Sequence, residues 1–312
     1  EQLAKLESGK NYLENYAALV GEKSSQQYTK EMEEYNCAYQ HWLKSTEEVK
    51  QKDPQASWKE IHKICGECPW PQPVGWQSPF RPNGLHETMI RRIAPYSLRG
   101  FLYYQGEEDV QRYADYSDMM QMLVKQWRMD WNDWNLPFLF VQLPMYLADG
   151  EKDDSYWALQ REQQYIASMM IQNAGMISLA DCGEYDNIHP LDKKTPGERL
   201  FQLAKNLVYD KQGTITATAA QLFSDNGKLY VTFDHLHEKL VMQTANGCPF
   251  EISGEDNLFY PAKADVIHGN MLCISNPAVK FPSAVKYAWY NFGEAALFTE
   301  SGNPVSPFFK CV

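Results

Sequence analysis

The chain has 312 residues, of which 44% are hydrophobic and 22% are charged, a composition typical of globular proteins. The net charge of −11 and the lack of a Lys/Arg cluster argue against nucleic acid as a partner, because neutralising phosphates requires a basic surface. No run of about twenty apolar residues is present, so no segment is expected to span a membrane.

The front of the chain is expected to be helical. Residues 10–53 are polar, nearly free of Gly and Pro, and carry apolar side chains at helical spacing, which predicts two helices. A short third helix is expected at 58–64, before a Pro-rich connector. His62 in this helix and Cys65 and Cys68 just after it have the spacing of half a zinc site. Because no second pair of ligands lies nearby, we favour a local disulfide or plain buried thiols over a metal.

From Ser97 the pattern alternates between apolar runs and amphipathic stretches. Strands are expected at 98–104, 137–143 and 176–180, and helices at 112–127, 156–171 and 196–208. Such alternation predicts a parallel sheet with helices on both faces. Binding and catalytic sites in these sheets lie at the carboxyl ends of the strands.

From Gly213 onward the pattern becomes one of short strands. Asn226-Gly227 between two apolar runs is a strong hairpin signal. Further strands are expected at 240–242, 249–252, 265–267, 271–274 and 284–289. We therefore divide the chain into a helical segment (1–75), a partial α/β domain (76–212) and a small all-β, sandwich-like domain (213–312).

Two short motifs are candidates for chemistry. Asp186 and His189 are three residues apart in a loop after a predicted strand, so the carboxylate can orient the imidazole as a general base. The alternative is a loop acid and a loop histidine without a chemical role. Gln105-Gly106 follows another strand and offers amide donors for an oxyanion. The alternative there is a turn glycine before an acidic helix start.

Together, Tyr103–Asp109 (YYQGEED) and Asp186–Pro190 (DNIHP) resemble two sequence blocks of the sialate O-acetylesterases, a branch of the SGNH hydrolases. Residues 78–90, 137–143 and 157–163 are similar to further segments of that family, in the same order. The resemblance covers nearly the whole chain and implies a three-layer α/β fold, incomplete at its N-terminus. It also implies Ser-His-Asp ester hydrolysis of acetylated sugars, without a metal or other cofactor, in a secreted, periplasmic or lysosomal setting.

Carried over to this chain, the resemblance gives His189 and Asp186 as the catalytic pair and Gln105 and Gly106 as oxyanion donors. Arg81 and Glu107 are the candidate substrate-binding residues, with Arg81 expected to bind a substrate carboxylate. Two family asparagines are replaced by carboxylates, Asp109 and Glu87, which puts efficient catalysis of the family type in question.

No segment resembles the family's nucleophile block, and Ser8, Ser24 and Ser25 lie in polar, helical sequence. The chain also opens on Glu1 rather than Met, so we expect a fragment or a processed chain. The serine is then expected from a missing N-terminal segment, with a separate chain as one option for its source. Acetylxylan or other sugar esters remain alternative substrates, and a non-catalytic carbohydrate-binding or partner subunit remains an alternative function. The aromatic content of 13% suits either core packing or sugar stacking.

Overall fold

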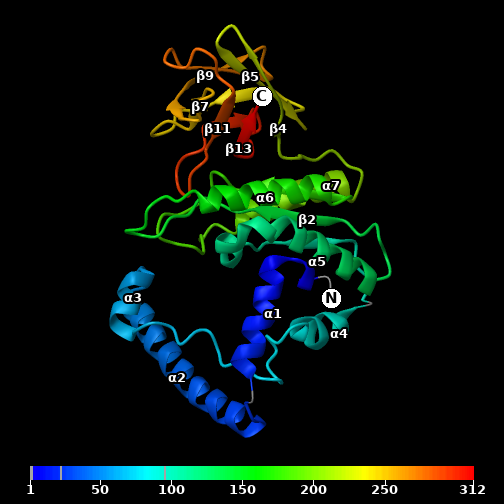
Figure 1. Ribbon diagram of the computed structural model, residues 1–312, viewed down its shortest axis with the longest axis vertical. Coiled ribbons are helices and arrows are strands. Elements are labelled where there is room, and N and C mark those ends of the chain that lie inside the picture. The colour runs from blue at the N-terminus through cyan, green and yellow to red at the C-terminus, as the bar shows by residue number, and fades with distance from the viewer. Residues whose placement is uncertain (1–2, 22, 95) are drawn as a thin grey trace. The chain divides into compact units, whose positions relative to one another are not determined.

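A computed structural model describes residues 3–21, 23–94 and 96–312 (Figure 1). The chain divides into two compact units, Glu1–Tyr96 and Ser97–Val312. Each is described below by itself. The functional division predicted from the sequence, with boundaries after residues 75 and 212, stays a prediction.

The first unit is helical, as expected. Its longest element, α2, begins at the Ser24 cap, whose side chain accepts from the Gln27 N–H, and α3 begins with a capping box of Ser57 and Glu60. Stacked rings along one side of α2 continue from Trp42 onto Trp58 of α3, at a centroid distance of 6.4 Å. The described elements are η1 (Leu3–Lys5), α1 (Glu7–Val20), α2 (Ser25–Lys52), α3 (Trp58–Cys65), the π-turn η2 (His86–Ile90) and α4 (Arg91–Ile93).

The second unit begins with a three-stranded parallel sheet in the order β1-β2-β3. Every residue of β2 is buried, as a central strand covered on both faces requires. Helices α5 and α6 pack on the face that carries Phe138 and Phe140, and α7 packs on the face that carries Leu139 and Val141. The predicted layered α/β fold is therefore confirmed. The elements are β1 (Phe101–Tyr103), η3 (Glu107–Asp115), α5 (Tyr116–Asp130), β2 (Phe138–Gln142), α6 (Tyr156–Met170), β3 (Ala174–Ser178) and α7 (Lys194–Leu207).

The helix predicted at 112–127 differs in detail. Arg112 has non-helical backbone angles (φ −123°, ψ 25°), which mark a kink within the 3₁₀ segment η3, and α5 begins only at Tyr116. The acidic residues Glu107 and Asp109 lie in the first turn of that 3₁₀ segment, where the helix dipole favours negative charge.

The remainder of the second unit is antiparallel, as predicted. One four-stranded sheet has the order β4-β5-β10-β9, a second has the order β13-β11-β7-β8, and β12 pairs with β6. Asn226 and Gly227 both have positive φ at the β4–β5 hairpin. The last two strands, β12 and β13, were not predicted. The elements are β4 (Thr218–Asp225), β5 (Lys228–Asp234), β6 (Leu240–Met242), β7 (Phe250–Ser253), β8 (Tyr260–Pro261), β9 (Lys263–Ile267), β10 (Met271–Ser275), β11 (Ala284–Tyr287), β12 (Leu297–Thr299) and β13 (Phe308–Cys311).

Buried polar side chains join the parallel sheet to the β-rich part. Arg161 of α6 is 1% exposed and donates to the carbonyl oxygens of Tyr290 and Pro144. Gln142, at the end of β2, donates to the Arg161 carbonyl at 3.0 Å and to the Ser306 hydroxyl at 2.9 Å. Burial lowers the pKa of the Arg161 guanidinium to about 10, so the side chain still carries its charge at neutral pH. The parallel sheet and the β-rich part are thus joined by specific hydrogen bonds as well as by apolar contact.

Replacing Arg161 by Met should destabilise this unit, because the carbonyls of Tyr290 and Pro144 would stay buried without their donor. We expect the free energy of unfolding to fall by about 3 kcal/mol, measured by urea denaturation. The matched control is Arg112→Met, since the Arg112 side chain is 54% exposed and its removal should change stability by less than about 0.5 kcal/mol. Equal midpoints for the two variants would show that Arg161 does not hold the layers together.

Candidate active site

The first candidate block follows β1, where the Gln105 side chain is fixed by hydrogen bonds. Its Nε2 donates to Asp109 Oδ2 at 2.6 Å. Its Oε1 accepts from the Tyr103 phenol at 3.1 Å. The Tyr116 phenol donates to the Gln105 backbone carbonyl at 3.0 Å and lies 3.4 Å from Oε1. Burial raises the pKa of both phenols, so they stay protonated and able to donate. One N–H of the predicted oxyanion donor is therefore already bonded to a carboxylate. This bond reduces the stabilisation that the Gln105 amide can give to a developing oxyanion.

Gly106 lies where α6 approaches the backbone closely. It is buried and has φ 148°, and a Cβ there would lie 3.0 Å from Gln164 Nε2 and 3.1 Å from Gln160 Nε2. Gln164 bonds the Leu143 N–H through Oε1 at 2.8 Å and the Gln105 carbonyl through Nε2 at 3.2 Å. Gln160 is fully buried, and neither atom of its amide has a partner in the described structure. These two glutamines behind the predicted oxyanion glycine were not identified from the sequence, although both lie on the predicted helix.

The second block lies in the loop between β3 and α7, which Glu184 and Asn187 brace from within. Glu184 accepts from the Asn187 side chain and from the Leu191 N–H, both at 2.6 Å. Asn187 in turn accepts from the His189 N–H at 3.1 Å. Just before α7, Asp192 accepts from the backbone N–H groups of Lys194 and Thr195. The hydrogen bond from the Thr195 hydroxyl, followed by the one from the Thr195 N–H, lowers the pKa of the Asp192 carboxyl. The backbone that carries the predicted catalytic pair is thus well defined.

Asp186 and His189 do not form the expected hydrogen bond with one another. Asp186 has φ 58°, and its Oδ1 accepts from the Asp149 N–H at 2.9 Å. The His189 ring is exposed and makes no hydrogen bond to any residue that the structure describes. The carboxylate therefore faces the nearby backbone of the Asp149 segment, and the imidazole remains accessible. The catalytic roles of both residues stay predictions.

Apolar contacts bring the two candidate blocks together. Ile188, next to His189, packs with Tyr104 against a buried cluster of Val110, Leu143 and Trp157. Farther along the same loop, Lys193 Nζ lies 5.4 Å from the centroid of the Tyr104 ring. The Gln105 block and the His189 loop are therefore neighbours beyond the carboxyl ends of β1 and β3, as the alternating pattern predicts.

Cys182 is the thiol closest in sequence to this site, but it is poorly suited to act as a nucleophile. Burial, followed by the charge of Asp181, raises its pKa to about 12, although Arg199 acts in the opposite direction. A thiol with this pKa is protonated at neutral pH, and the thiolate is the reactive form. Ser24 caps α2, while Ser8 and Ser25 belong to α1 and α2. All three lie in helical surroundings, as expected from the sequence.

The candidate substrate-binding residues have different surroundings. Arg81 belongs to the first unit, where its guanidinium pairs with Glu87 at 2.6 Å and donates to the Ser78 carbonyl at 3.0 Å. Glu107 belongs to the second unit, at the start of η3, and its carboxylate has no hydrogen bond within the described residues. A substrate carboxylate would therefore have to compete with Glu87 for Arg81.

The cysteine-rich segment holds neither a disulfide nor a metal-binding cluster in the described structure. Cys65 and Cys68 are free thiols, and His62 Nδ1 lies 3.4 Å from Glu67 Oε2. Among the described residues, no three or more His, Cys, Asp or Glu side chains are grouped as metal ligands. Within the same ranges, no helix has both the length and the apolar character needed to cross a bilayer.

Comparison with known proteins agrees with the motifs. Residues 73–206 match the family described as carbohydrate esterase, sialic acid-specific acetylesterase, and the matched region contains all six candidate site residues. The sialate O-acetylesterase of Mus musculus is 26% identical over 260 residues, which are 74% of this chain and 47% of that protein. The sialate O-acetylesterase of Homo sapiens is 25% identical over 208 residues, 60% of this chain and 39% of that protein.

A solved structure extends the likeness to the fold. The crystal structure of a carbohydrate acetylesterase from Xanthomonas citri superposes with a TM-score of 0.66 at 30% identity, covering 72% of this chain and 53% of that one. The chain thus spans about half the length of the relatives that it matches.

The two buried glutamines of α6 should respond in opposite ways to replacement by Leu. Gln160→Leu removes an amide without partners, so we expect the free energy of unfolding to rise by about 1 kcal/mol. Gln164→Leu leaves the Leu143 N–H without its side-chain acceptor and takes one donor from each of the Gln105 and Val141 carbonyls, so it should lower the free energy of unfolding by about 2 kcal/mol. Urea denaturation of both variants tests the pair, and a loss of stability in Gln160→Leu would contradict the unpaired amide.

Proposed function

We propose that the chain belongs to the sialic acid-specific acetylesterase family of carbohydrate esterases, whose members it resembles in sequence and fold, and that it serves in removing O-acetyl groups from sialic acids. The observation that carries this proposal is that Ile188 and Tyr104 pack against the same buried cluster, which places the His189 loop near the Gln105 block. A base and an oxyanion donor at the same end of one parallel sheet are what acyl transfer through a serine requires.

In the proposed reaction His189 takes the proton of a serine hydroxyl as the serine oxygen attacks the acetyl carbonyl, and gives that proton to the sugar oxygen as its bond to the acetyl group breaks. His189 then takes a proton from water, which releases acetate from the acyl-serine and restores the serine hydroxyl. Asp186 would turn from the Asp149 N–H to the imidazole and stabilise its charged form. The second N–H of Gln105 and the Gly106 N–H would bind the oxyanion. We assign the substrate carboxylate to Arg81, which would have to leave Glu87. Glu107 would accept from a sugar hydroxyl.

We propose that the serine is supplied from outside these 312 residues. The support is the edge of the parallel sheet at β1, where Leu102 is 66% exposed while all of β2 is buried. A further strand beside β1 would cover Leu102. Its carboxyl end would bring a residue to the same end of the sheet as Gln105.

Two observations favour a second candidate function, that of a non-catalytic carbohydrate-binding or partner subunit. Asp109 occupies one N–H of the Gln105 amide, and Asp186 is bonded to backbone instead of to His189. Acetylxylan and other acetylated sugars remain alternative substrates, since the family motifs alone do not select among them.

The first test is ester hydrolysis. We expect the 312-residue chain alone to hydrolyse O-acetylated sialic acid no faster than its His189→Ala variant. With the proposed serine-bearing segment attached, turnover should appear and should fall by roughly 10³-fold or more in His189→Ala. His235→Ala, an exposed histidine of the β-rich part, is the matched control. Turnover by the chain alone that requires His189 would place the nucleophile within it. A silent complete protein would support the non-catalytic function.

A second test concerns the carboxylate on the predicted oxyanion donor. Asp109→Asn removes the negative charge that binds Gln105 Nε2, so kcat of the assembled enzyme should rise about tenfold, equivalent to about 1.4 kcal/mol of transition-state stabilisation. Glu108→Gln removes a neighbouring, exposed charge and should change kcat by less than about twofold. Equal effects of the two substitutions would mean that the response is one of net charge alone.

A further inference from the structure

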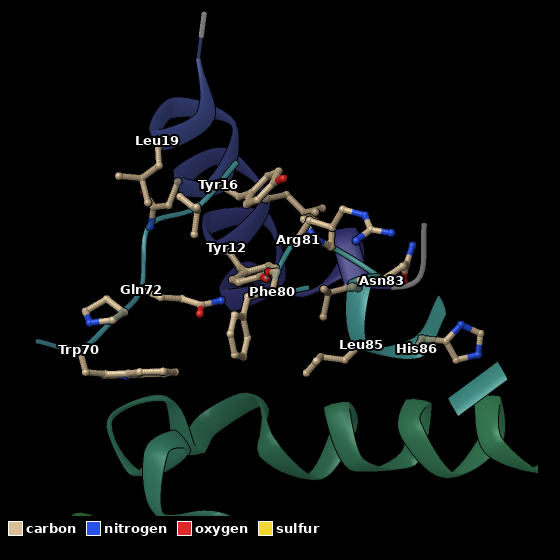
Figure 2. Close-up of a pocket in the computed structure, with 17 residues that line it drawn as sticks. Tyr12, Tyr16, Leu19, Trp70, Gln72, Phe80, Arg81, Asn83, Leu85 and His86 are labelled. Atoms are coloured by element: carbon tan, nitrogen blue, oxygen red, sulfur yellow. Dashed lines mark hydrogen bonds between the residues drawn. The ribbon is translucent and has the colours of Figure 1, made fainter. Parts of the chain in front are cut away.

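The first unit contains a pocket of about 510 Å³ that none of the predicted motifs explains as a whole (Figure 2). Three segments form it: the outward face of α1, the connector around residues 70–74 and the turn at 80–86. Its volume lies within the range of small-molecule sites, and its lining is mostly apolar with a few polar groups.

Hydrogen bonds from two tyrosines hold these walls together and leave their ring faces to the pocket. Tyr12 OH donates to the Phe80 carbonyl at 2.8 Å, and Tyr16 OH donates to the Gly75 carbonyl at 3.0 Å. Since both hydroxyls are used in joining α1 to the other two segments, the pocket's shape is fixed by polar bonds within the unit.

An exposed aromatic corner forms one side of the pocket. The rings of Trp70 and Phe80 meet edge to face, with centroids 5.7 Å apart and an interplanar angle of 90°. Trp70 is 59% exposed, Tyr12 45% and Phe80 38%. Large aromatic surface left in water at a concave site is typical of a binding surface.

Neutral amides supply the polar groups. In Figure 2 the Gln72 side chain reaches into the pocket above the Trp70 ring, toward Tyr12 and Phe80. The amides of Gln72 and Asn83 make no hydrogen bond to other described residues, so they can bind a ligand. The guanidinium of Arg81 is already balanced by Glu87. The pocket therefore combines a flat apolar ring, free amide donors and acceptors, and no unbalanced charge on Arg81.

We propose that this pocket binds an uncharged pyranose ring. The apolar C–H face of such a ring would stack on Trp70, and its hydroxyls would bond to the amides of Gln72 and Asn83. The ligand class rests on the proposed function, because an enzyme acting on sugar esters would meet neutral sugars of the same glycan. The pocket would then hold a sugar without the acetyl ester, and its binding does not need the catalytic pair.

The test is saturation-transfer NMR on the 312-residue chain with methyl β-D-galactopyranoside and methyl α-D-glucopyranoside, with decanoate as an apolar probe. We expect at least one glycoside to bind with a dissociation constant of the order of a millimolar, with the strongest transfer to its C–H face. Trp70→Ala should weaken binding about tenfold, and Trp70→Tyr, which keeps a ring, should retain most of it. Gln72→Leu should weaken it about fivefold.

Trp134→Ala is the matched control, because Trp134 is 56% exposed and lies in the second unit, outside the pocket. Circular dichroism checks that each variant is folded. No transfer to either glycoside, binding that is indifferent to Trp70→Ala, or binding of decanoate alone would overturn the proposal.

The two proposals fail separately. Glycoside binding that persists in His189→Ala without any ester hydrolysis by the complete protein would remove only the esterase function. Hydrolysis that requires His189, without glycoside binding at Trp70, would overturn only the proposal that the pocket binds a sugar.

Discussion

The arrangement of the second unit depends on the charged side chain of Arg161, which is buried in its interior. Arg161 of α6 reaches the carbonyls of Tyr290 and Pro144, while Gln142 holds the Arg161 carbonyl and the Ser306 hydroxyl. Placing a guanidinium away from water is costly, and that cost is offset only when its donors meet acceptors in one arrangement. Such bonds specify how the β-rich part meets the parallel sheet more narrowly than apolar packing alone would. The end of β2 is thereby fixed. Leu143, which follows β2, belongs to the buried cluster against which both candidate blocks pack.

The candidate site combines one side chain held by hydrogen bonds, that of Gln105, with one that makes none in the described structure, that of His189. Gln105 is oriented by Tyr103 and Tyr116 and restrained by Asp109, so its geometry is set before any ligand arrives. His189, by contrast, presents a ring without hydrogen bonds in the described structure, on a loop whose backbone Asn187 braces. Preorganised donors and an accessible base are two parts of the acyl-transfer site that the match of residues 73–206 to a carbohydrate esterase family leads one to expect. The Asp109 carboxylate restrains the Gln105 amide that would serve as the oxyanion donor.

Patterns with strong periodicity were predictable from the sequence. The apolar run of β2, the Asn226-Gly227 hairpin and the helices of the first unit follow from local rules. Strands β12 and β13 were not, because their burial comes from partners distant in sequence, and Pro304 and Pro307 separate them. The two motifs were identified from the sequence, but the orientation of their side chains was not. Asp186 bonds to the backbone of a segment 37 residues away, which no spacing rule reveals.

The left-handed backbone at Asp186 restricts which acid can serve there. At φ 58° most side chains crowd their own carbonyl, whereas Asp and Asn tolerate this region because their short polar groups bond locally. A glutamate would carry the same charge and reach farther, yet it would strain the turn that aims the loop. The backbone conformation thus selects for side-chain length as well as for charge. Asparagine and glycine fit this position, whereas glutamate, the residue chemically closest to aspartate, is disfavoured.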